Sequence, residues 1–134
     1  MRINPNYADA WSNKGLALTN LAKYEEAIEC YDKAVRINPN EALAWYTKGN
    51  TLSKLGKYEE ALQCYDKALR INPNYANAWT NKGYALNKLG NYQQALECYN
   101  EAIKLDPNNA EVWNDMSALL TCINKKKAGS GNNN

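Results

Sequence analysis

The feature that most constrains how this chain can fold is a sequence repeat of constant length. One repeat interval separates Trp11 from Trp45. The interval recurs in four residue types: Trp at 11, 45, 79 and 113; Cys at 30, 64 and 98; Tyr at 31, 65 and 99; Pro at 39, 73 and 107. Segments 23–40 and 57–74 differ only at Ile28, Glu29 and Val35 of the first copy. A period of this length is typical of solenoids, in which each repeat is one supersecondary unit that buries its apolar face against its neighbours.

Each period contains two helical patterns. In the first repeat, Trp11, Gly15, Leu18 and Leu21 follow the spacing of one helical stripe, and a second amphipathic stripe runs from Tyr24 to Ile37. The Asn-Pro-Asn or Asp-Pro-Asn triplets that follow predict the end of the second helix, because proline cannot continue it.

Glycines mark the end of the first helix. Gly56 and Gly90 stand where a left-handed residue after a helix is expected, whereas Ala22 holds that place in the first repeat. We therefore expect a strained or differently shaped turn at Ala22. Inside the helices, small residues such as Gly15 and Ala27 recur with the period, and we expect Trp11, Tyr31 and their equivalents to pack against them.

The order Trp, Gly, Leu, Ala, Tyr, Ala, Pro within one period resembles the tetratricopeptide repeat family. The resemblance covers full repeats at 8–41, 42–75 and 76–109 and the first helix of a fourth at 110–123. It implies an all-α fold, a right-handed α-solenoid of antiparallel helix pairs with a concave groove. Residues 2–7 copy residues 70–75, so we interpret 1–7 as the tail of a preceding repeat. We expect the polar segment 124–134 to be a disordered tail.

Composition argues against several function classes. The net charge of +2 favours neither nucleic acid nor a membrane surface as partner, and no apolar run approaches a membrane span. The chain has no His, and no known catalytic motif occurs. Cys30, Cys64 and Cys98 lack metal-site spacing. We expect a cytoplasmic protein that is not an enzyme and needs no cofactor or metal.

The resemblance implies that the solvent-facing side of the first helices lines the groove. The candidate peptide-binding residues are Asn13, Leu16, Asn20, Tyr46, Thr47, Asn50, Lys54, Asn77, Asn81, Tyr84, Lys88 and Asn114. Amide side chains offer donors and an acceptor to a peptide backbone. Asn13, Asn81 and Asn114, interrupted by Thr47, look like the asparagine ladder of protein O-GlcNAc transferases. The alternative is that these amides merely keep an exposed helix face soluble.

Chaperone-binding members of the family hold a C-terminal carboxylate with Lys and Arg side chains on this face. One register places Ser12, Leu16, Thr47, Asn77 and Asn81 at those positions; the other places Tyr46, Asn50, Asn81, Glu111 and Asn114 there. Neither register supplies the cations, so we do not expect this carboxylate clamp.

Two function hypotheses remain. The first is a scaffold that binds a segment of a partner polypeptide in the groove. The second is a structural module that self-associates as a homo-oligomer through its C-terminal helix, whose apolar residues lack a covering second helix. That edge comprises Val112, Trp113, Met116, Leu119, Leu120 and Ile123.

Overall fold

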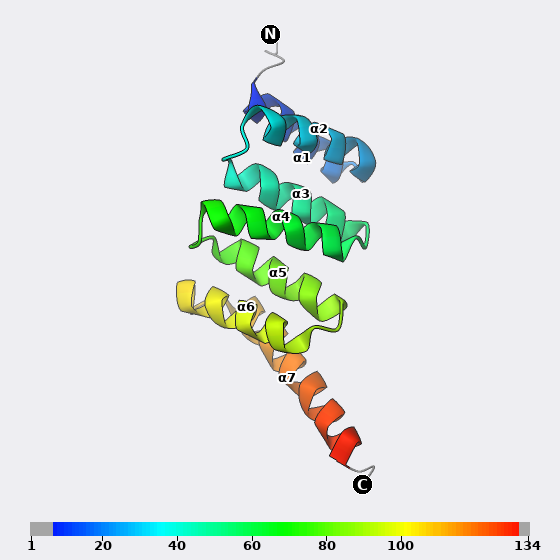
Figure 1. Ribbon diagram of the computed structural model, residues 1–134, viewed down its shortest axis with the longest axis vertical. Helices are drawn as coiled ribbons and strands as arrows, with labels where there is room; N and C mark the ends of the chain where they lie inside the picture. The colour runs from blue at the N-terminus through cyan, green and yellow to red at the C-terminus, as the bar shows by residue number, and fades with distance from the viewer. Residues whose placement is uncertain (1–6, 132–134) are drawn as a thin grey trace.

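The computed structural model describes residues 7–131, with side chains up to residue 128. These residues form seven helices and no strand: α1 Ala8–Asn20, α2 Tyr24–Ile37, α3 Ala42–Lys54, α4 Tyr58–Ile71, α5 Ala76–Lys88, α6 Tyr92–Leu105 and α7 Ala110–Gly131. Three helix pairs stack along one axis, and α7 follows at the C-terminal end (Figure 1). The all-α solenoid of stacked helix pairs is therefore confirmed. Apart from Tyr7, the expected remnant of a preceding repeat lies outside the described residues.

A tyrosine on the second helix of each repeat packs against a glycine on the first. A Cβ added to Gly15, Gly49 or Gly83 would lie 2.7 Å from the Cε1 atom of Tyr31, Tyr65 or Tyr99. These three rings are at most 1% exposed. The close approach explains why the recurring position is glycine, since any side chain there would displace a buried ring.

The tryptophans are less buried than the sequence analysis expected. Trp45 and Trp79 are half-buried, and their indole Nε1 atoms donate hydrogen bonds of 2.8 Å to the carbonyls of Pro39 and Pro73 in the preceding loops. Because the tyrosine ring already fills the space beside each glycine, the indole packs at the junction between repeats. These two tryptophans thus tie their helices to the loop that ends the previous repeat.

The turn at Ala22 has the backbone strain that the sequence predicted. Ala22 has φ +60°, beside +77° at Gly56 and +83° at Gly90. The same pair of hydrogen bonds closes all three turns; in the first, Ala22 N–H donates to Thr19 and Lys23 N–H donates to Leu18, both at 2.9 Å. This double closure of a helix end requires the left-handed conformation, which alanine adopts at a cost.

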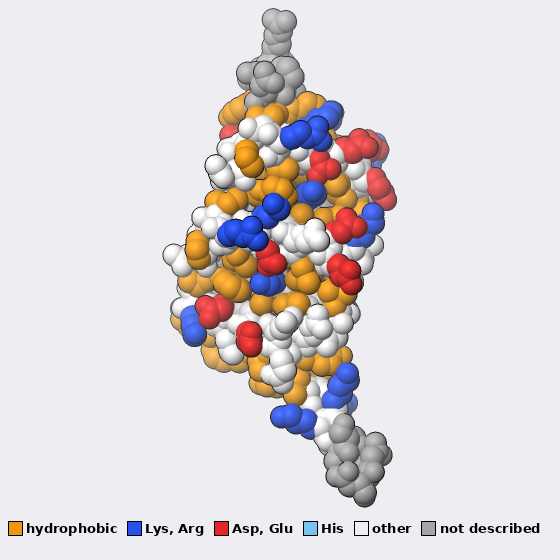
Figure 2. Space-filling model, viewed as in Figure 1, with side chains coloured by type: hydrophobic (Ala, Val, Ile, Leu, Met, Phe, Trp, Pro, Cys, Tyr) orange, Lys and Arg blue, Asp and Glu red, His pale blue; other side chains and the backbone are white. Residues whose placement is uncertain are grey.

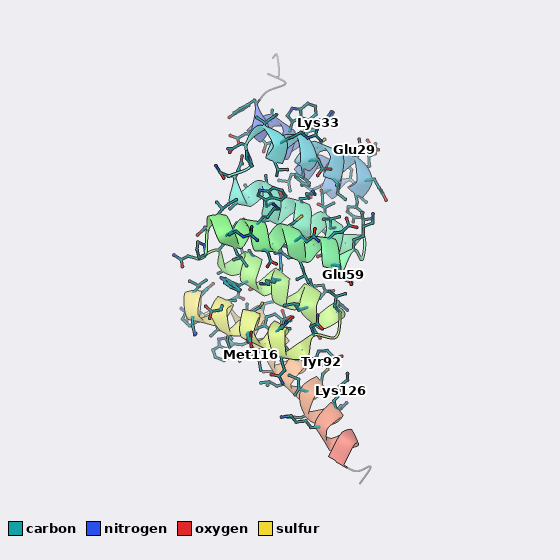
Figure 3. All side chains as sticks on the ribbon, viewed as in Figure 1. Glu29, Lys33, Glu59, Tyr92, Met116 and Lys126 are labelled. Carbon is teal, nitrogen blue, oxygen red and sulfur yellow. The ribbon has the colours of Figure 1, made fainter. Side chains whose placement is uncertain are left out.

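The prediction that a disordered tail begins at residue 124 is wrong over the described residues, because α7 continues to Gly131. Residues 124–128 read Asn-Lys-Lys-Lys-Ala, in which lysine and alanine favour helix and no proline intervenes. The Lys126 ammonium also lies 4.8 Å from the centre of the Tyr92 ring on α6 (Figure 3). Helix propensity and the contact with Tyr92 together favour a helix here, although the polar composition had predicted a disordered tail.

Candidate functional site on the first helices

The first helices of neighbouring repeats contact one another through polar side chains. Between α1 and α3, the hydroxyls of Thr19 and Thr51 lie 3.1 Å apart. Between α3 and α5, Asn81 Nδ2 donates to Asn50 Oδ1 at 2.8 Å. We call the surface formed by the twelve candidate residues on α1, α3, α5 and α7 the first-helix face.

A hydrogen-bonded cluster of two asparagines and two tyrosines lies at the centre of this face. Asn50 Oδ1 accepts from the Tyr65 hydroxyl at 2.7 Å as well as from Asn81. Asn81 Nδ2 also donates to the Tyr46 hydroxyl at 3.0 Å. The cluster joins α3, α4 and α5, and it fixes the orientation of both amides because each hydrogen bond requires a particular end of the amide group.

The rings around the cluster are packed together. The Tyr46 ring centre lies 4.8 Å from that of Tyr75 and 6.1 Å from that of Tyr65. Burial, with a smaller contribution from Tyr46, raises the pKa of Tyr75 to about 12. Burial also raises the pKa of Tyr65 well above its usual value. These phenols are therefore neutral over the ordinary pH range.

The cluster leaves two groups unpaired among the described residues. Both donor hydrogens of the Asn81 amide have acceptors, but its carbonyl oxygen Oδ1 accepts no hydrogen bond. Asn50 Oδ1 accepts twice, whereas its Nδ2 group donates none. One acceptor and one donor group on half-buried, oriented amides match the N–H and C=O groups of an extended peptide backbone.

A second group on the face surrounds Tyr84, whose side chain is 43% exposed. The Lys88 ammonium lies 5.3 Å from the Tyr84 ring centre, and the ring meets that of Tyr58 edge-on at 6.2 Å. Held between these neighbours, Tyr84 offers a flat apolar surface on the same helix as Asn81.

Other candidate residues lie apart from the cluster. Asn13, Leu16 and Asn20 are exposed on α1, as are Lys54 on α3 and Asn77 on α5. The single hydroxyl hydrogen of Thr47 is shared by the carbonyls of Leu43 and Ala44 in its own helix, so this donor is already used. The structure thus concentrates the face on Tyr46, Asn50, Asn81 and Tyr84.

Asn114 does not continue the asparagine ladder. It falls just short of a full repeat interval after Asn81, and the equivalent position belongs to Asp115. Asn114 is exposed, whereas Asp115 is half-buried, and desolvation followed by the charge of Glu111 raises its pKa. Asp115 in turn contributes to a raised pKa of Tyr99, where burial is the larger cause. Counting one full repeat interval from Asn81 would have identified Asp115 as the equivalent residue in the fourth repeat.

Tyr65 and Tyr75 were also missed as members of the site. Tyr65 was interpreted as a core residue only, yet its hydroxyl reaches through the helix pair to Asn50. Tyr75 precedes α5, and only the tertiary structure brings its ring onto Tyr46.

Only part of the predicted self-association edge on α7 is exposed. Leu119 and Val112 are almost completely buried and Ile123 is 9% exposed, because α7 packs this side against α6. Met116 is half-buried in the same core. Trp113 and Leu120 remain exposed on the edge, at 44% and 38%.

The cysteines of the described residues form neither a disulfide nor part of a metal-type cluster. Burial raises the pKa of the Cys64 and Cys98 thiols to about 11, and all four cysteines are free thiols. Residues 7–131 contain no group of three or more His, Cys, Asp or Glu placed to hold a metal ion. None of the seven helices described is long and apolar enough to cross a membrane.

Comparison with known proteins gives a consistent assignment. The family model described as "Tetratricopeptide repeat" matches residues 8–41, 42–75 and 76–109, and a second model with the same description matches 98–129. An uncharacterized protein of Methanocaldococcus jannaschii is 58% identical over 31 residues, which is 23% of this chain and 36% of that protein. The chain therefore matches about a third of the length of that relative.

Solved structures share the fold over most of the chain. The first tetratricopeptide domain of human RPAP3 superposes with a TM-score of 0.88 at 26% identity, covering 93% of this chain and 98% of that one. The second such domain of human RPAP3, in complex with the HSP70 peptide SGPTIEEVD, gives 0.81 at 27% identity over 84% and 93%. The first domain of Spaghetti (RPAP3), bound to the HSP90 peptide SRMEEVD, gives 0.86 at 24% identity over 92% and 98%. With three consecutive repeats matched and the helix pairs in place, the chain belongs to the tetratricopeptide repeat family.

Proposed function

We propose that this chain is a protein-interaction scaffold, not an enzyme, and that its first-helix face binds an extended segment of a partner polypeptide. The observation that carries the proposal is the pair of oriented amides, Asn50 and Asn81, each with an unused polar group at a half-buried position. Tyr46 and Tyr84 supply aromatic surface beside them. A cytosolic setting would keep the free thiols reduced.

Peptide binding by structural neighbours supports this use of the fold. Two of the similar domains are bound to peptides that end in Glu-Glu-Val-Asp. This chain has Ser12, Thr47 and Asn77 at three of the positions where the family's carboxylate clamp uses Lys, Asn and Lys. We therefore propose recognition of peptide backbone through amide hydrogen bonds instead of recognition of a terminal carboxylate.

The test starts from a displayed library of random dodecapeptides selected against the chain. A selected peptide is titrated calorimetrically against wild type, Asn50→Ala and Asn81→Ala. Each substitution removes one or two backbone hydrogen bonds, so we expect affinity to fall by about tenfold. SRMEEVD should bind at least about tenfold more weakly than the selected peptide, because Ser12, Thr47 and Asn77 provide no cation at the clamp positions for its terminal carboxylate.

Two further variants make the test specific. Asn100→Ala removes an exposed amide from α6 on the second-helix side and should leave affinity unchanged. Tyr65→Phe removes the internal hydrogen bond to Asn50 but keeps both amides; it should reduce stability and retain binding. If Asn50→Ala and Asn81→Ala fold normally and bind the selected peptide as tightly as wild type, the proposed face is wrong.

Self-association of the C-terminal helix is the second candidate function, and two exposed side chains favour it. Trp113 and Leu120 form the remaining apolar edge, although the Trp113 indole already donates to Pro107 at 2.8 Å. In this case Leu120→Glu should convert an oligomer into a monomer in sedimentation equilibrium, while Asn81→Ala should not. A wild-type chain that stays monomeric at millimolar concentration would exclude this candidate.

A further inference from the structure

A groove outside the first-helix face lies where α4, α5 and α6 meet. It encloses about 750 Å³ and is lined by Trp79, by apolar side chains that include Leu62 and Leu86, and by three carboxylates. Figure 2 shows this side, with the second helices α2, α4 and α6 in front and charged side chains around apolar patches. None of these residues belongs to the first-helix face.

In each of the first two repeats, a lysine ammonium from the second helix lies over the tryptophan ring that corresponds to Trp79. Lys33, labelled on α2 in Figure 3, has its ammonium 4.3 Å from the Trp11 ring centre. One repeat later, the Lys67 ammonium lies 4.9 Å from the Trp45 ring centre. Both lysines come from the second helix of the same repeat as the ring they cover. A cation over an indole face is a favourable interaction because the ring carries negative charge density on its faces.

The third repeat breaks this pattern at one position. The residue one full repeat interval after Lys67 is Glu101, so the second helix provides no ammonium to Trp79. Lys82 from α5 lies 5.4 Å from the Trp79 ring centre, as Lys48 lies 5.6 Å from that of Trp45. The lysine contributed by the first helix is therefore retained, and the lysine contributed by the second is replaced by a carboxylate.

The charge of the groove changes accordingly. Asp66, Glu97 and Glu101 line the groove at Trp79 together with Lys82, which gives three negative charges against one positive. The corresponding groove at Trp45 is lined by Glu60, Lys48 and Lys67, and it encloses about 260 Å³. Lys48 is also paired with Asp32, as Lys82 is with Asp66. The groove at Trp79 is thus the larger of the two, and Glu101 in the place of Lys67 makes it the more acidic.

The carboxylates of this groove are only partly neutralised. Asp66 Oδ1 forms an ion pair with Lys82 Nζ at 2.8 Å. Glu101 pairs with Lys104 at 3.3 Å, but the Lys104 side chain is 72% exposed, and such a surface pair is weak. Glu97 forms no ion pair within residues 7–128. A cation entering the groove would meet both an indole and free carboxylate charge.

We propose that the groove at Trp79 binds a lysine side chain of a partner polypeptide, which takes the place that Lys33 and Lys67 occupy in the preceding repeats. The ammonium lies over the Trp79 ring and pairs with Glu101 and Glu97, and the aliphatic stem packs on the apolar floor. This site goes beyond the proposed function, because it is built from different residues of α5 together with α4 and α6, and it recognises a charge instead of peptide backbone.

The experiment follows the four indole N–H signals by NMR, with Trp79 assigned through Trp79→Phe. Four nonapeptides of otherwise identical Ala/Ser sequence carry Lys, Arg, norleucine or Glu at the centre. The Lys peptide should shift the Trp79 signal with an affinity about tenfold above that of the norleucine peptide, and the Glu peptide should not bind. The Arg peptide measures how far the site prefers an ammonium over a guanidinium.

The internal repeats supply variants that the fold tolerates. Glu101→Lys installs the residue found at positions 33 and 67 and should abolish the shift by filling the site. Glu97→Gln copies Gln63 and should weaken Lys-peptide binding severalfold through loss of one charge. Asn81→Ala, on the first-helix face, should leave Lys-peptide binding unchanged, so this test is independent of the proposed function.

Three outcomes would overturn the proposal. The first is equal binding of the Lys and norleucine peptides, and the second is undiminished binding to Glu101→Lys. The third is a Trp79 shift that depends on protein concentration without added peptide, because this would assign the groove to a second copy of the chain.

Discussion

The Cβ atom of Ala22 is expected to lower the stability of the whole array, because Ala22 has a left-handed backbone conformation. Ala22 holds φ +60° in a turn whose counterparts are Gly56 and Gly90, and the hydrogen bonds of the three turns match. A left-handed conformation costs a residue with a Cβ about 1–2 kcal/mol. Ala22 is exposed, so its methyl group contributes little packing to offset this cost.

Ala22→Gly should therefore raise the free energy of unfolding. The relief of about 1–2 kcal/mol is reduced by the greater entropy of glycine in the unfolded chain, about 0.5–1 kcal/mol. The net gain should be about 0.5–1 kcal/mol, which corresponds to a rise in Tm of about 2–4 °C for a chain of this size. Urea unfolding followed by far-ultraviolet circular dichroism, together with thermal melts, measures both quantities.

Gly56→Ala and Gly90→Ala are the matched controls. A Cβ at either position would have nothing within 4 Å, so any loss of stability arises from the backbone alone. Each should cost about 1 kcal/mol. If Ala22→Gly leaves the urea midpoint unchanged while both reverse substitutions are also neutral, the argument from left-handed strain is refuted.

Three further predictions concern the core and its titrating groups. Gly49→Ala should destabilise the fold by about 1–2 kcal/mol in urea, because the new Cβ would lie 2.7 Å from the buried Tyr65 ring; a neutral result would show that the ring can move aside. At pH 8, DTNB should react rapidly with the exposed Cys122 alone, since burial raises the pKa of Cys64 and Cys98 to about 11 and also raises that of Cys30; fast release of more than one equivalent would contradict this. Between pH 10 and about 12 the free energy of unfolding should fall, because the unfolded chain ionises its tyrosines at their usual pKa while burial keeps Tyr65, Tyr75 and Tyr99 neutral in the folded state. Tyr75→Phe should make the fall shallower, and an unchanged slope would place the effect elsewhere.

The sequence alone determined the repeat, the number of helices per repeat and the strained turn at Ala22. These features depend on local chemistry: the spacing of apolar residues, proline after the second helix, and glycine where a left-handed residue is needed. Because the three repeats have nearly the same sequence, a correct assignment of helices and turns in one repeat holds for all three. The matching positions of Gly15, Gly49 and Gly83 followed from the same counting.

The tertiary structure decided which side chains share a surface and which are buried. Leu119 and Ile123 belong to the core because α7 packs on α6, a contact that a helical pattern without its neighbour does not specify. Asn50 and Asn81 form a hydrogen bond between the first helices of adjacent repeats. Which of their amide groups remain unpaired is therefore known only once both helices are placed. The groove at Trp79 likewise needs three helices to meet. Local patterns set the elements, whereas distances between elements set the sites, because hydrogen bonds and burial depend on atoms that lie far apart in the chain.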